Sequence, residues 1–217
     1  RETLTVGETA GLTPETLLSF ISLEDGVFSM VFEFSWCQLE LKGPNYFWYD
    51  RQEWTPEDLK RELFSSHEMA GDRGWFGVCT ENHDQPRSID HYLPREGRNY
   101  YGATMLASMY LLLRGTPYVY QGQEIGMTNW RPESTSMYED VQTRNQHPDW
   151  PEEKRLALYH RASRDSARTP VQWTDGENAG FTTGTPWFYV NENYKDINVE
   201  QALHDPDSIL NFCLLYT

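Results

Sequence analysis

The chain has 217 residues, and its 33 acidic side chains outnumber its 18 basic ones, which gives a formal net charge of −15 at pH 7. Nucleic acids and anionic membrane surfaces are bound by basic faces, so this charge argues against both as partners. Aromatic residues make up 14% of the chain, a share that disordered sequences lack and that supplies a hydrophobic core. The chain begins at Arg1 and shows no basic-then-apolar leader and no apolar run of about 20 residues, so we expect neither a signal peptide nor a membrane span.

Short β-prone runs alternate with helical segments over the first 120 residues. In chain order we expect a strand at Leu4–Val6, a helix from Thr13–Pro14 to about Ile21, a strand at Met30–Phe34, a helix from Thr55–Pro56 to about Ser66, a strand at Trp75–Cys79, a helix from Arg98 to Leu113 and a strand at Pro117–Tyr120. The two Thr-Pro pairs predict helix starts, because Thr caps free backbone N–H groups and Pro fits the first helical position. This alternation is typical of an α/β chain with parallel strands.

The segment from Arg98 to Leu113 has the periodicity of a buried helical face. Its apolar positions three and four residues apart are Ala103, Leu106, Ala107, Tyr110 and Leu113. Gly115 follows closely, and we expect it to serve as the stop signal of this helix.

A long polar excursion follows the fourth expected strand, over about 126–198. We expect it to hold two helices, near 134–146 and 151–162, before Asp205–Ser208 opens a final helix. Four strand–helix units cannot close an eight-stranded barrel, which typically needs about 250 residues. The pattern therefore predicts an α/β fold that corresponds to half of a barrel.

The three cysteines, Cys37, Cys79 and Cys213, are widely spaced and form no Cys-x-x-Cys pair. We therefore expect no metal site and no cofactor. An odd number of scattered thiols suits a reducing compartment, so we expect a cytoplasmic protein without disulfides.

Acidic side chains directly follow two of the expected strands. Glu8 comes behind Gly7 after the first strand, and His83 and Asp84 follow the third. Barrel enzymes place catalysis at the carboxyl ends of parallel strands, so these groups could face one cleft. Two carboxylates in one cleft suit glycoside hydrolysis, in which one acid protonates the leaving oxygen. For each carboxylate taken singly, a solvated surface charge is the alternative.

Five stretches resemble the α-amylase superfamily, glycoside hydrolase family 13. Thr5–Glu8, Glu81–Arg87 and Gly115–Asn129 are similar to three of its motifs, in the family's order and spacing. Ser163–Trp173 and stretches within Asn178–Val199 resemble its α-glucosidase branch, meaning oligo-1,6-glucosidase and its neighbours. The resemblance implies the C-terminal half, strands five to eight, of a (β/α)8 TIM barrel, with a long helical excursion after the last strand.

The resemblance also implies roles for single residues. Glu8 matches the family's general acid/base, and Asp84 matches the carboxylate that stabilises the transition state. His83 matches the partner that hydrogen-bonds the same glucose, and Arg164 matches an arginine that holds the terminal sugar. These roles agree with physical expectation, because a fixed carboxylate stabilises the positive charge that develops in an oxocarbenium-like transition state.

We also assign roles to four further residues of these motifs. Gln85 and Arg87 lie where the leaving sugar would sit, so we expect both to bind substrate. Arg168 is expected to order its loop rather than touch sugar, and Glu124 to shape the pocket wall.

The chain also departs from the family pattern. The nucleophile motif, Gly-Phe-Arg-Met-Asp-like, does not occur, so residues 1–217 are interpreted as a partial catalytic barrel domain without its N-terminal half, its nucleophile strand and its C-terminal β-sandwich. The usual calcium loop would also lie outside this chain. Gln142 is neutral where many relatives carry an acid, and the segment from Trp36 to Glu53 matches poorly and lacks the Arg-Leu-Asp-Arg-Asp run of sucrose isomerases.

Together these features predict a fragment of a retaining α-glucosidase that hydrolyses short oligosaccharides, from a monomeric parent enzyme. A glucosyl-transferring or sucrose- or trehalose-isomerising relative is the first alternative. A non-catalytic relative of the heavy chains of amino-acid transporters is the second. The linkage preference, 1,6 or 1,4, stays open at this point, and the sequence upstream of the chain would separate these readings.

Overall fold

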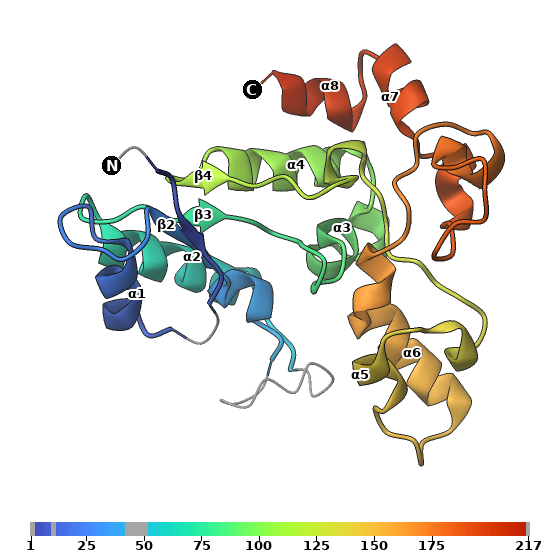
Figure 1. Cartoon of the computed structure of the whole chain (residues 1–217), viewed down its shortest axis with the longest axis horizontal. Coiled ribbons are helices and arrows are strands. Elements are labelled where there is room, and N and C mark those ends of the chain that lie inside the picture. Colours follow the sequence, from blue (N-terminus) through green and yellow to red (C-terminus); the bar gives the residue numbers. More distant parts are fainter. Residues whose placement is uncertain (1–2, 10–11, 42–51, 216–217) are drawn as a thin grey trace. The chain divides into compact units, whose positions relative to one another are not determined.

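The computed structural model describes residues 3–9, 12–41 and 52–215 (Figure 1). Two compact units divide the chain. The first comprises Arg1–Thr80 and Tyr110–Tyr118, and the second comprises Glu81–Met109 and Val119–Thr217. Residues 42–51, within the stretch that departs from the family pattern, lie outside the described residues.

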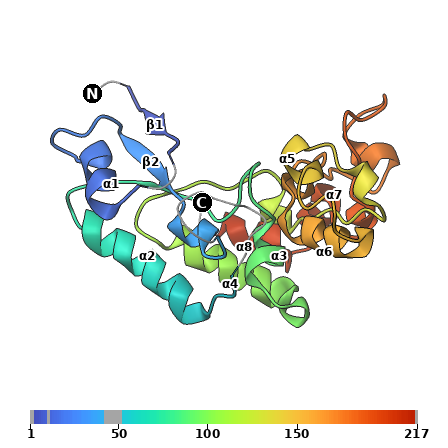
Figure 2. The ribbon, with the colours of Figure 1, turned by 90° about the horizontal axis from the view of Figure 1, so that it is seen from below.

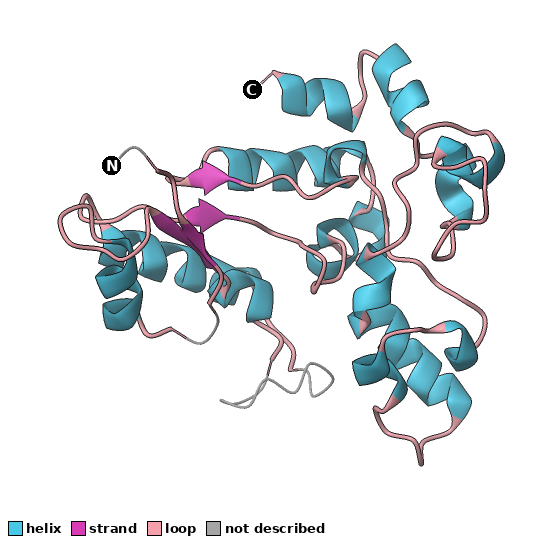
Figure 3. Ribbon diagram, in the orientation of Figure 1, coloured by secondary structure: helices cyan, strands magenta, loops and turns pink. Residues whose placement is uncertain are grey.

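A four-stranded parallel sheet forms the centre of the first unit (Figure 3). Its strands, in spatial and chain order, are β1 (Val6–Gly7), β2 (Met30–Glu33), β3 (Gly77–Val78) and β4 (Thr116–Pro117). The register pairs Val6 with Met30, Phe32 with Gly77 and Gly77 with Thr116. All four strands run in the same direction, so they end at the same edge of the sheet. The predicted α/β class with parallel strands is confirmed.

Two glycines let neighbouring strands approach closely. A Cβ atom on Gly77 would lie 3.0 Å from the Tyr118 ring. Gly115 has φ +143°, and a Cβ there would lie 2.7 Å from the carbonyl oxygen of Phe76. The prediction that Gly115 ends the preceding helix is wrong, because that helix already ends at Leu111. Gly115 instead lets the chain enter β4 against β3.

The helices α1 (Pro14–Ile21) and α2 (Pro56–Ala70) pack against each other in the first unit (Figures 1 and 2). Both begin where the Thr-Pro pairs predict. Thr13 accepts the N–H of Thr16, and Thr55 with Asp58 forms a capping box. Helix α2 continues one turn past the predicted end, because its buried face extends to Ala70.

The long helix α4 (Tyr100–Leu111) follows the short helix α3 (Ser88–Tyr92). The predicted apolar face is confirmed at four positions that are buried, Ala103, Leu106, Ala107 and Tyr110. Leu113 lies past the end of the helix and is half-buried.

The polar excursion is less helical than its sequence predicts. Helix α6 (Glu152–Ala162) lies as expected, but the helix expected over 134–146 is only a 3₁₀ turn, Thr135–Met137, and the four-residue helix α5 (Val141–Arg144). The backbone between these pieces is extended at Tyr138 and Asp140. The N–H groups of Glu139 and Asp140 donate to the Asp165 carboxylate, so side-chain bonds replace helical ones there.

The chain then forms α7 (Val199–His204) and α8 (Ile209–Leu214). Helix α7 was not predicted from the sequence. Ser208 caps α8 as expected from the Asp205–Ser208 start. Among the described residues, no helix is both long and apolar enough to cross a bilayer.

Candidate active site

Glu8 follows β1 directly, at the edge of the sheet where the strands end, and its side chain is exposed. Gly7 lets β1 lie close to β2 just before Glu8, because a Cβ on Gly7 would come within 2.9 Å of the Val31 side chain on β2. Glu8 belongs to the first unit. His83, Asp84 and Arg164 belong to the second unit, and their geometry is described within it.

Asp84 lies between two guanidinium groups of the second unit. Its Oδ1 accepts a hydrogen bond from Arg164 Nη1 at 3.2 Å and another from Arg168 Nη2 at 2.6 Å. The Nε2 atom of His83 lies 3.5 Å from the other oxygen, Oδ2. The structure thus brings together three residues that the sequence reading selected, and it adds Arg168.

Both arginines come from one 3₁₀ turn, Arg164–Ala167, and the residue after it. Ser163 caps this turn by accepting the N–H of Asp165. The four-residue spacing of the arginines lets both side chains reach Asp84. Arg168 also donates from Nε to the carbonyl oxygen of His83 at 2.7 Å. The expectation that Arg168 orders its loop agrees with this contact, and the same guanidinium also holds the carboxylate.

Asp140 accepts a hydrogen bond from the second terminal nitrogen of Arg164. The distance between Arg164 Nη2 and Asp140 Oδ1 is 2.5 Å. Burial would raise the pKa of Asp140, but hydrogen bonds from Arg164 and Thr143 outweigh it and leave the pKa below its ordinary value. The hydrogen bond to Asp140 in turn raises the pKa of Arg164, so the pair is charged at neutral pH.

Arg87 and Gln85 lie deeper than their expected substrate-binding role requires. The Arg87 side chain has no exposed surface, and its Nη1 donates to Glu81 Oε1 at 2.9 Å and to the carbonyl oxygen of Gln121 at 2.6 Å. Gln85 is only 3% exposed. A sugar could reach the Arg87 guanidinium only by displacing its protein partners. The geometry therefore favours a structural role for Arg87, in which it ties Glu81 to the Gln121 loop.

Glu124, which the sequence predicts to shape the pocket wall, is half-buried in the second unit, and its role stays a prediction. Burial raises the pKa of its carboxyl group. It lies in a 3₁₀ turn, Gln123–Ile125, flanked by Gly122 and Gly126 in left-handed conformations.

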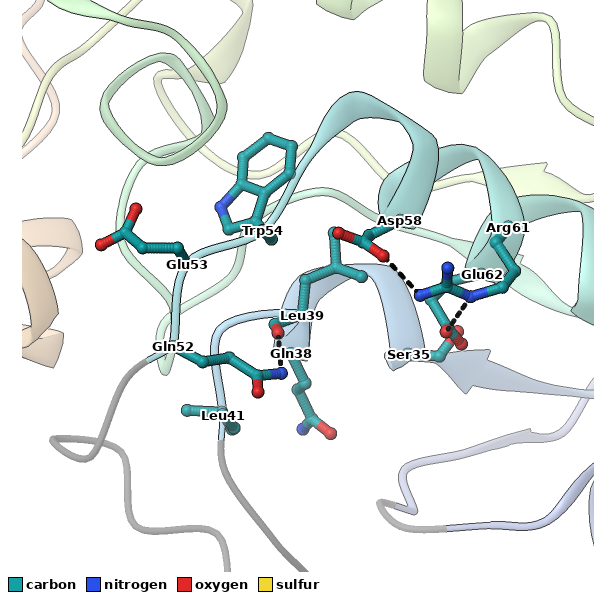
Figure 4. A pocket seen from close by; sticks show the side chains of 10 residues that line it. All are labelled: Ser35, Gln38, Leu39, Leu41, Gln52, Glu53, Trp54, Asp58, Arg61 and Glu62. Carbon is teal, nitrogen blue, oxygen red and sulfur yellow. Dashed lines mark hydrogen bonds and ion pairs between the residues drawn. The ribbon is translucent and has the colours of Figure 1, made fainter.

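A separate cavity of about 420 Å³ lies in the first unit, beside the start of α2 (Figure 4). Trp54, Asp58, Arg61 and Glu62 are among its lining residues, and Arg61 pairs with Asp58 at 2.6 Å. None of the residues predicted to bind substrate lines this cavity.

A parallel sheet with acidic side chains in the segments that follow two of its strands is a feature of barrel glycosidases. Residues 1–214 match the α-amylase catalytic domain family, and the chain belongs to that family. The family resemblance noted in the sequence is thereby confirmed.

Within the family, the chain is similar to two curated oligo-1,6-glucosidases. The chain is 40% identical over 216 residues to the oligo-1,6-glucosidase of Parageobacillus thermoglucosidasius, covering 96% of this chain and 38% of that protein. It is 41% identical over 211 residues to the oligo-1,6-glucosidase of Halalkalibacterium halodurans, covering 95% and 37%. It thus spans under two fifths of the length of these curated relatives.

The chain is also similar to solved structures of two other enzymes. The trehalose-6-phosphate hydrolase of Bacillus licheniformis superposes with a TM-score of 0.90 at 37% identity, over 99% of this chain and 39% of that one. The isomaltulose synthase of Protaminobacter rubrum superposes with a TM-score of 0.90 at 29% identity, over 100% and 40%.

Sequence reasoning missed Asp140 as a member of this group. The one local signal is Thr143 three residues later, which marks Asp140 as a helix cap rather than as a partner of Arg164.

Proposed function

We propose that this chain supplies the acid/base, Glu8, and the transition-state-stabilising carboxylate, Asp84, to a retaining α-glucosidase that acts on short α-glucosides. The observation that carries the proposal is Asp84 itself, whose carboxyl group accepts hydrogen bonds from Arg164 and Arg168 beside an exposed His83. The roughly 40% identity to oligo-1,6-glucosidases supports isomaltose-type substrates.

The chemistry follows from these side chains. Glu8 protonates the leaving sugar oxygen, and the bond from that oxygen to the anomeric carbon breaks as positive charge develops on the glucosyl ring and the enzyme's nucleophile bonds to that carbon, which gives the glucosyl-enzyme. Asp84 is already fixed by two guanidinium groups, so it stabilises that charge with little reorganisation. In the second step Glu8, now ionised, accepts a proton from water as that water attacks the glucosyl-enzyme.

The nucleophile must come from outside these 217 residues. No segment of the sequence matches the family's nucleophile motif. We infer that the chain acts as strands five to eight of a barrel within a longer polypeptide, called here the complete enzyme. The 217 residues alone should hydrolyse no chromogenic α-glucoside, and normal retaining turnover from them would contradict this inference.

Two enzyme activities compete with this proposal, and each has a named relative. The similarity to isomaltulose synthase favours a glucosyl-transferring reaction, and that to trehalose-6-phosphate hydrolase favours a phosphorylated substrate. Neither competitor requires a different role for Glu8 or Asp84.

Product analysis of the complete enzyme tests the proposal. We would incubate it separately with isomaltose, maltose, sucrose and trehalose 6-phosphate, and follow products by chromatography. Glucose released fastest from isomaltose supports the proposal. Isomaltulose formed from sucrose, preferential cleavage of trehalose 6-phosphate, or no turnover of any of these sugars would overturn it. We expect EDTA to leave the rate unchanged, because no catalytic step is assigned to a metal.

A further inference from the structure

Asp140 is a buried carboxylate next to the proposed site, with both of its oxygen atoms engaged. Its Oδ1 accepts from Arg164 Nη2, and its Oδ2 accepts from the N–H and the hydroxyl of Thr143 at 2.8 and 2.7 Å. The side chain is 4% exposed, so sugar has almost no access to it. Any influence that Asp140 has on catalysis must therefore pass through a neighbour.

Arg164 is that neighbour, and its guanidinium is divided between two carboxylates. Nη2 binds Asp140 at 2.5 Å, whereas Nη1 binds Asp84 at the longer distance of 3.2 Å. A guanidinium is planar and rigid, so the separation of its two terminal nitrogens is fixed, and a bond to one nitrogen limits where the other can lie. Because Asp140 holds Nη2, only Nη1 of Arg164 contacts Asp84.

Other bonds fix Asp140 relative to the arginine turn. The Asp165 carboxylate accepts the N–H groups of Glu139 and Asp140 at 2.8 and 2.9 Å. The hydroxyl of Thr143 lies 2.9 Å from that of Ser163, the residue that caps the turn. Asp140 therefore keeps its place without relying on Arg164 alone.

The two arginines leave one oxygen of Asp84 for other partners. Arg164 and Arg168 both donate to Oδ1, and Oδ2 faces His83. If Asp140 lost its charge, Arg164 would be free to turn both nitrogens onto Asp84. Bidentate pairs between arginine and carboxylate are strong and occupy both oxygens. That closure would block the oxygen that sugar hydroxyls need.

We propose that Asp140 is a positioning residue: it holds Arg164 away from a bidentate pair with Asp84 and so keeps Asp84 Oδ2 open to the substrate. This inference rests on the proposed function, in which Asp84 contacts the glucosyl group.

A double-mutant cycle in the complete enzyme tests this inference. The variants are Asp140→Asn, Arg164→Gln and the combination, assayed for kcat and KM with p-nitrophenyl α-glucoside. We expect Asp140→Asn to lower kcat/KM about 10- to 100-fold. This is the usual effect of losing a hydrogen bond to a charged group, here the bond between the substrate and Asp84 Oδ2. In the Arg164→Gln background the same change should cost less than about twofold, because the residue through which it acts is gone.

A matched control separates positioning from general stability. Asp90 is similarly buried, at 3% exposure, and pairs with Arg98 and Arg131 rather than with the arginines on Asp84. Asp90→Asn should lower the melting temperature but leave kcat/KM within about twofold. If Asp140→Asn does not fold, Thr143→Val loosens Asp140 without removing its charge, and its smaller loss should likewise vanish in the Arg164→Gln background.

The outcomes separate the two proposals. If the effects of Asp140→Asn and Arg164→Gln multiply, or if Asp140→Asn has no effect while Arg164→Gln is impaired, the positioning role is wrong and the proposed function stands. If Arg164→Gln leaves kcat/KM unchanged, Arg164 does not influence Asp84 and the positioning role is wrong, whereas the proposed function is decided separately by the product analysis and by Asp84→Asn.

Discussion

Glu33 allows a quantitative test of the first unit that does not depend on the proposed function. It ends β2, and its carboxylate accepts the hydroxyl of Ser35 at 2.7 Å and the N–H of Ser35 through both oxygens. Burial favours the protonated form, and the nearby charge of Glu62 adds to this effect. The bonds from Ser35 oppose it, and the pKa of Glu33 rises from 4.5 to about 6.

A raised carboxyl pKa means that the folded chain binds a proton more tightly than the unfolded chain. The contribution of Glu33 to stability is therefore complete below pH 4.5 and is lost as the pH rises through about 6. With this pKa, ionisation of Glu33 destabilises the folded chain by roughly 2 kcal/mol at pH 7.5 and by about 0.8 kcal/mol at pH 5, relative to a side chain that stays neutral. Glu33→Gln carries no charge at any pH and keeps an acceptor for Ser35, so it should remove this cost.

The assay is urea unfolding of the full chain, followed by tryptophan fluorescence between pH 5 and 7.5. The free energy of unfolding of Glu33→Gln, relative to the unmodified chain, should increase by about 1 kcal/mol over this range. Glu68→Gln, an exposed position on α2, serves as the control and should show a flat difference. A pH-independent difference for Glu33→Gln, or a relative loss of stability at pH 7.5, would refute the reasoning.

Three further predictions concern the complete enzyme. Glu8→Gln should abolish turnover of isomaltose, whereas activated aryl glucosides should still form the covalent intermediate, and azide should restore their turnover by forming a glucosyl azide. Hydrolysis of isomaltose within tenfold of the normal rate would reject the acid/base role. Asp84→Asn should lower kcat by several orders of magnitude with little change in KM, whereas a loss confined to KM in steady-state assays would mean ordinary binding. In chemical denaturation, Arg87→Met should destabilise the fold by about 3–5 kcal/mol, because it leaves Glu81 buried without its ion-pair partner, and adding Glu81→Gln should recover part of that loss. Equal stability of the single and double variants would argue against the buried pair.

The sequence by itself determined the features that depend on neighbouring residues. Thr13 and Thr55 marked helix starts because a cap needs only the next three residues, and the buried face of α4 followed from spacing within one helix. The parallel order of the strands followed from their alternation with helices. The family was readable because its motifs are short and contiguous.

Only the tertiary structure decided the features that depend on distant residues. Arg164 and Asp84 are 80 residues apart, and nothing local to either one indicates that they meet. The expected helix over 134–146 gave way because Asp165, about 25 residues further on, takes the N–H groups that would have continued it. Arg87 looked like a substrate ligand beside Asp84, but Glu81 and Gln121 surround its guanidinium. In each case a bond between segments far apart in the chain overrides the local preference, because a buried polar group must find a partner wherever the fold provides one.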